Sequence, residues 1–126
     1  MNNNKIRPKH LNLFKIRMPV TAVVSIAHRA SGALLVILIP AIVYLLQHSL
    51  HSAQTYDEVV QLMTQPWMKV LLIIGTWAIS HHFFAGIRYL LIDIDIGVLK
   101  SSARRSAWVV HLLALVSALW MAGTLL

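Results

Sequence analysis

Residues 80–89 read SHHFFAGIRY and lie inside a mostly apolar run that extends over residues 70–92. At about 1.5 Å per helical residue, this run is long enough to cross a hydrocarbon core of roughly 30 Å. His82 lies near the middle of the run. An ionisable side chain at that depth costs about 3 kcal/mol on insertion scales, so His82 marks a candidate functional site.

The histidine at position 82 first suggests an axial ligand of haem. Gly86 falls four residues on, on the same helical face, and leaves room for a flat ring. The other interpretation is a hydrogen bond across helices, which buried polar side chains often form in membrane bundles. His81 points about 100° away round the helix, so both histidines cannot face one iron. We expect His82 to be the ligand and His81 to be a packing or hydrogen-bonding residue.

Composition places the chain in the membrane. Of its 126 residues, 58% are hydrophobic and 12% are charged, whereas a soluble domain carries about a quarter charged residues. The length predicts a single domain, residues 1–126. The lack of cysteine excludes disulfides, cysteine-ligated iron–sulfur clusters and cysteine-based zinc sites. The net charge of +7 is not arranged as a stripe with exposed aromatics, so we expect no nucleic acid partner.

The apolar runs predict an all-α membrane protein with three transmembrane helices, over about residues 23–47, 68–92 and 107–126. Basic residues precede the first run and occupy the turn at residues 100–105, whereas residues 48–66 contain neither lysine nor arginine. The positive-inside rule then predicts a cytoplasmic N-terminus and a periplasmic C-terminus. We expect residues 48–66 to be an exposed polar loop, and residues 1–20 to be a retained cytoplasmic segment.

A second unusual segment, SIAHRASG at residues 25–32, stands at the entrance of the first span. Ser25, His28, Arg29 and Gly32 recur at helical spacing and therefore share one face. One interpretation is that Arg29 reaches the lipid headgroups with His28 beside it. The other is that a cation, an imidazole and a hydroxyl together hold an anion such as a haem propionate, or a quinone carbonyl.

With both segments considered, the sequence resembles the cytochrome b membrane-anchor subunit of succinate dehydrogenase, respiratory complex II. The segment SIAHRASG at residues 25–32 favours this larger anchor over its shorter hydrophobic partner. Tyr89 departs from the pattern, because bacterial relatives often have histidine there, and this leaves the role of the position open. The matching pieces are RP at 7–8, LNL at 11–13, PVTA at 19–22, SIAHRASG at 25–32, HFFAGIR at 82–88, and Asp93.

The resemblance implies a role for each matching residue. His82 would be one axial ligand of a b-type haem (haem b), and a second hydrophobic anchor subunit would supply the other histidine. His28 and Arg29 would lie near the haem propionates. Ser25 and Arg29 would border the ubiquinone pocket, which the partner anchor and the iron–sulfur subunit complete. Arginine suits this task because it donates hydrogen bonds and keeps its charge.

The resemblance also implies what the subunit does in its complex. The sequence has no flavin-binding glycine fingerprint and no cysteines for clusters, so it would not oxidise succinate alone. It would anchor the flavoprotein and iron–sulfur subunits, hold haem and help to form the quinone site. The absence of a transit peptide points to a bacterial inner membrane. The alternatives are a fumarate reductase anchor that runs the reaction in reverse, and a cofactor-free structural subunit whose histidines join helices.

The spacing of the histidines predicts that this chain cannot supply both axial ligands of one haem. We expect His28 near the cytoplasmic edge of its span, and His111 only four or five residues inside the end of the third span near Trp108. His82 is about eleven residues from Asp93. At 1.5 Å per residue the depth gap is roughly 9–10 Å, more than the distance of about 4 Å between two axial nitrogens. His111 is then expected to be a hydrogen-bonding residue.

Overall fold

The computed structural model describes residues 18–125, and its regular secondary structure there is entirely α-helical. The prediction of an all-α protein with three spans is confirmed, because three of its four helices are long and apolar enough to cross a membrane. The orientation of the termini stays a prediction, and residues 1–17 lie outside the described residues. The helices are α1 (Val20–Ser49), α2 (Ala53–Thr64), α3 (Pro66–Asp93) and α4 (Lys100–Leu125).

The helix that contains the third predicted span begins before that span. Helix α4 starts at Lys100 and not near residue 107, because lysine and arginine are good helix formers and continue the helix beyond the apolar run. Arg104 and Arg105 therefore stand on the first turns of α4 and not in a loop. The reversal between α3 and α4 is short and uses positive φ angles at Asp95 (61°) and Gly97 (80°).

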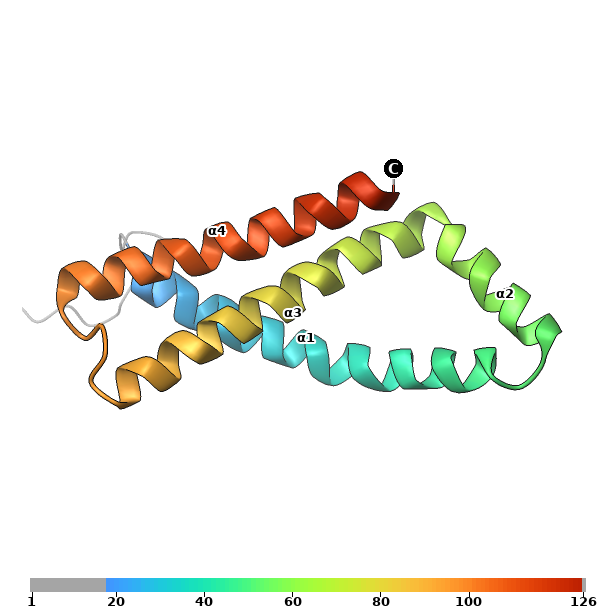
Figure 1. Cartoon of the computed structure of the whole chain (residues 1–126), viewed down its shortest axis with the longest axis horizontal. Helices are drawn as coiled ribbons and strands as arrows, with labels where there is room; N and C mark the ends of the chain where they lie inside the picture. The colour runs from blue at the N-terminus through green and yellow to red at the C-terminus, as the bar shows by residue number, and fades with distance from the viewer. Residues whose placement is uncertain (1–17, 126) are drawn as a thin grey trace, which may run out of the picture.

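Residues 48–66 are not the loop that we expected, because most of them form α2. A capping box starts this helix: the Ser52 N–H donates to Thr55 Oγ1 (2.9 Å), and the Thr55 N–H donates to Ser52 Oγ (3.1 Å). Pro66 occupies the first position of α3, where a missing N–H costs nothing. Figure 1 shows α2 closing the gap between the diverging ends of α1 and α3.

Helix α3 is the centre of the arrangement, because it packs against both α1 and α4 (Figure 1). The start of α1 also meets α4. Small side chains fill much of the contact, which lets membrane helices approach closely. Most large apolar side chains on the long helices are exposed and are available to lipid or to other subunits. The buried alanines are Ala78, Ala85, Ala107, Ala114 and Ala118.

Candidate functional site

Four histidines from three helices gather where the helices cross. His28 of α1 stacks on His82 of α3, with ring centroids 4.2 Å apart and planes at 11°. His81 of α3 meets His111 of α4, with 3.3 Å between His81 Nε2 and His111 Nδ1. The two neighbouring histidines of α3 therefore contact different helices, as a rotation of about 100° per residue requires. The expectation that His81 and His111 form hydrogen bonds is confirmed.

The ring of His82 is held through its Nδ1 atom. This nitrogen lies 3.2 Å from the backbone oxygen of His28 and 3.4 Å from Ser31 Oγ. Because a carbonyl oxygen only accepts, Nδ1 carries the proton in this contact, and Nε2 keeps its lone pair. The described residues offer Nε2 no hydrogen-bond partner. Histidines that bind metals commonly have this arrangement, with one nitrogen donating to a carbonyl and the other free.

The glycine beside His82 is Gly32, whereas Gly86 lies beside His28, and the expectation that Gly86 leaves room for haem stays a prediction. A Cβ at position 32 would lie 2.9 Å from His82 Cε1, whereas a Cβ at position 86 would lie 3.9 Å from His28 Nε2. The reason is that helical side chains lean toward the N-terminus of their helix, away from the residue four positions on. Each of the two stacked histidines thus packs beside a glycine of the opposite helix.

The predicted depth gap between the histidines was also wrong, because His28 and His111 lie in contact with the histidines of α3. The error came from the end of the third span. Since α4 begins at Lys100, His111 lies eleven residues inside it, and His82 lies eleven residues from the end of α3. Close contact does not make either residue a second ligand. The His28 ring lies parallel to the His82 ring, and His111 is engaged with His81.

The two residues predicted at the quinone site follow each other by one turn of α1. Ser25 is half-buried and Arg29 is exposed, so the guanidinium is open to a ligand or to another subunit. Sequence reasoning missed Ser31, which is fully buried and donates from Oγ to the His28 carbonyl (2.9 Å). Its position three residues after His28 was a signal, because a serine there can reach that carbonyl.

A second missed residue is Arg88, which is only 7% exposed. Its Nε donates to Ser106 Oγ (3.0 Å) and its Nη2 donates to the Ala103 oxygen (3.2 Å). The guanidinium carbon also lies 5.3 Å from the centroid of the Tyr89 ring. Arg88 therefore joins α3 to the start of α4. The signal was a lone cation inside an apolar run, since such a charge needs polar partners.

The donor set is compatible with haem. Residues 18–125 contain no group of three or more histidine, cysteine, aspartate or glutamate side chains that could hold a metal ion. Haem does not need one, because its macrocycle supplies the other nitrogens and the protein supplies only axial ligands. A neutral imidazole with a free Nε2, as at His82, is a suitable axial ligand.

Together these features define a helical membrane subunit with a histidine cluster at the crossing of its spans. Residues 3–121 match the family described as succinate dehydrogenase/fumarate reductase transmembrane subunit, and the chain belongs to this family. The resemblance found in the sequence is thereby confirmed.

Three curated relatives carry names from the same complex. The chain is 35% identical to the succinate dehydrogenase cytochrome b556 subunit of Coxiella burnetii, over 90% of this chain and 92% of the relative. It is 28% identical to the subunit of the same name from Paracoccus denitrificans, over 83% and 81%. It is also 36% identical to the succinate dehydrogenase hydrophobic membrane anchor subunit of Archaeoglobus fulgidus, over 58% and 62%.

Proposed function

We propose that this chain is the cytochrome b anchor subunit of a succinate dehydrogenase in a bacterial inner membrane, and that it holds haem b through His82. The contact between His82 Nδ1 and the His28 carbonyl carries the proposal, because it leaves Nε2 free to bind iron. The names of the relatives from Coxiella and Paracoccus, which are cytochrome b556 subunits, support the cofactor. Bound haem b would accept and donate single electrons.

The second axial histidine would come from a second hydrophobic anchor subunit. Two imidazoles that ligate one iron point their nitrogens at each other from opposite sides of the haem. The parallel rings of His28 and His82, with centroids 4.2 Å apart, do not have this relationship. The support for a shared haem is therefore the ring geometry and not the depth of the histidines.

Ser25 and Arg29 would contribute to the site where ubiquinone is reduced. The exposed guanidinium of Arg29 is able to donate to a quinone oxygen and to stabilise the negative charge that develops there. The hydroxyl of Ser25, one turn earlier, is a second donor. His28 and Arg29 would also lie near the haem propionates. The partner anchor and the iron–sulfur subunit would complete the quinone pocket, and a flavoprotein subunit would oxidise succinate.

The relatives' names favour succinate oxidation over fumarate reduction, since all three are named as succinate dehydrogenase subunits. The quinone extracted from the purified complex would test this choice. A ubiquinone supports succinate oxidation, and a low-potential quinone supports a fumarate reductase.

Optical spectra of the purified, reduced complex test the haem assignment. The amount of haem is expressed per flavin in the complex, so that equal amounts of complex are compared. The wild-type complex should show the sharp bands of b-type haem, and His82→Leu should lose or alter them. His81→Leu is the matched control, because it changes the neighbouring histidine that contacts α4 instead. A full, unaltered haem spectrum in His82→Leu would contradict the assignment. A wild-type complex without haem bands would indicate a structural subunit.

A separate measurement tests the shared haem. The chain expressed without its partner anchor should not form stoichiometric six-coordinate haem, because the His28 imidazole is stacked parallel on the His82 ring and is not placed as a second ligand. A lone, monomeric chain with a full bis-histidine haem spectrum would refute this part of the proposal.

A further inference from the structure

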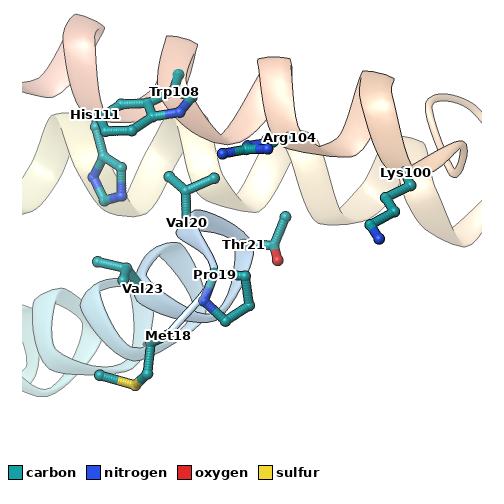
Figure 2. A pocket seen from close by; sticks show the side chains of 9 residues that line it. All are labelled: Met18, Pro19, Val20, Thr21, Val23, Lys100, Arg104, Trp108 and His111. Atoms are coloured by element: carbon teal, nitrogen blue, oxygen red, sulfur yellow. The ribbon is translucent and has the colours of Figure 1, made fainter. Parts of the chain in front are cut away.

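A cavity of about 650 Å³ lies between the start of α1 and the start of α4, and no residue of α3 lines it. Figure 2 shows the side chains of the two helices facing each other across it. The α4 side is formed by residues at helical spacing along one face. These residues are Lys100, Arg104, Trp108 and His111.

The chemistry of the cavity changes along α4. Lys100 and Arg104 supply two cations at the beginning of the helix, and Trp108 follows one turn further on. The Trp108 ring adds apolar surface between these cations and the inner end of the cavity. His111 stands at the inner end, and its Nε2 atom is buried without a hydrogen-bond partner among residues 18–125.

The opposite wall is mainly apolar. Val20 and Val23 of α1 line the cavity together with Met18 and Pro19, and Thr21 adds one hydroxyl. The cavity therefore has a cationic mouth and an apolar interior. A ligand that satisfies both parts has an anionic head and a hydrocarbon tail.

Charge complementarity favours an anionic occupant. Residues 1–17 contain five lysine and arginine residues and no acid, so their charge does not complement Lys100 and Arg104. None of the nine residues that line the cavity is acidic, so no side chain in its wall neutralises the two cations. Basic pockets between membrane helices are known to bind anionic lipid headgroups.

We propose that this cavity binds one anionic phospholipid. Lys100 and Arg104 hold the phosphate, and an acyl chain lies along Val20 and Val23 toward His111. The proposal does not depend on the haem assignment, because none of the residues that line the cavity is proposed to bind haem.

Native mass spectrometry of the lipid-depleted complex tests this site, with dioleoyl phosphatidylglycerol and dioleoyl phosphatidylcholine as probes. We expect one tightly bound phosphatidylglycerol and markedly weaker binding of phosphatidylcholine. Arg104→Gln should weaken phosphatidylglycerol binding about fivefold, as expected for the loss of one basic residue near an anionic headgroup. Arg105→Gln is the matched control, because Arg105 is exposed and outside the cavity lining. It should leave the affinity within about twofold.

Several outcomes would overturn the proposal. Equal binding of the two lipids, or equal effects of Arg104→Gln and Arg105→Gln, would show only general attraction to a basic surface. Glycerol 3-phosphate that competes as well as the lipid would show that the apolar wall plays no part. A photo-crosslinker at position 104 that captures a protein subunit and no lipid would show a protein interface. If Arg104→Gln does not assemble, Lys100→Gln makes the same test.

Discussion

The rings of His28 and His82 stack at 4.2 Å, while the backbone oxygen of His28 lies 3.2 Å from the Nδ1 atom of His82. One residue of α1 thus contacts the proposed haem ligand twice, through its ring and through its carbonyl. The carbonyl fixes the proton on Nδ1, and the ring limits how the imidazole can turn. We infer that His28 is a positioning residue for His82.

Replacement of His28 separates stacking from other roles. His28→Phe keeps a flat ring and the backbone carbonyl, whereas His28→Ala removes the ring. If stacking positions His82, haem occupancy and midpoint potential should change more in the alanine variant than in the phenylalanine variant. Redox titration of the haem bands measures both. Equal changes in the two variants would contradict the stacking role and would favour a contact of the imidazole with a haem propionate.

Gly32 should not tolerate a side chain. A Cβ there would approach His82 Cε1 to 2.9 Å and Nδ1 to 3.3 Å, so the ring must shift and lose its contact with the His28 carbonyl. We expect Gly32→Ala to lower haem occupancy in the purified complex. Gly75→Ala is the control, because its Cβ would meet only Leu38 Cδ1 at 3.6 Å, an ordinary contact. A normal spectrum in Gly32→Ala would show that this close approach does not constrain the ligand.

The contact between His81 and His111 should stabilise the packing of α3 on α4. His81 is fully buried, and its Nε2 is 3.3 Å from His111 Nδ1. Interhelical hydrogen bonds in membranes contribute about 0.6–2 kcal/mol. A double-mutant cycle with His81→Phe and His111→Leu should therefore show a coupling energy in this range, measured by thermal unfolding of the complex in detergent. Additive effects of the two substitutions would mean that the pair contributes nothing beyond its packing.

Arg29 should matter for quinone reduction more than for succinate oxidation. Arg29→Leu removes a charged donor worth about 1.5–3 kcal/mol, which corresponds to a loss of roughly tenfold or more in succinate–quinone activity. Ser25→Ala removes a neutral bond of about 1 kcal/mol and should have a milder effect. Activity with an artificial acceptor that takes electrons from the soluble subunits is the control. Parallel loss of both activities would indicate faulty assembly and would remove the support for a quinone role.

Local sequence was sufficient to predict three helices that can span a membrane, because the length of an apolar run sets whether a helix can cross a bilayer. It was also sufficient to select His82 and the stretch from Ser25 to Gly32, since polar groups at membrane depth need partners. It failed where polar residues continue a helix. The start of α4 at Lys100 and the capped helix α2 lack the long apolar run that identified the spans, although Tyr56, Val59, Val60 and Met63 of α2 recur at helical spacing.

The pairing of the histidines was decided only by the tertiary structure. Helical spacing places His81 and His82 on different faces, but it does not say which helix each face meets. The crossing of α1 and α3 sets His28 on His82 and brings Gly32 under the ring, while the packing of α4 sets His111 against His81. These contacts join residues 30 to 54 positions apart, and they depend on crossing angles and helix ends that no local pattern encodes.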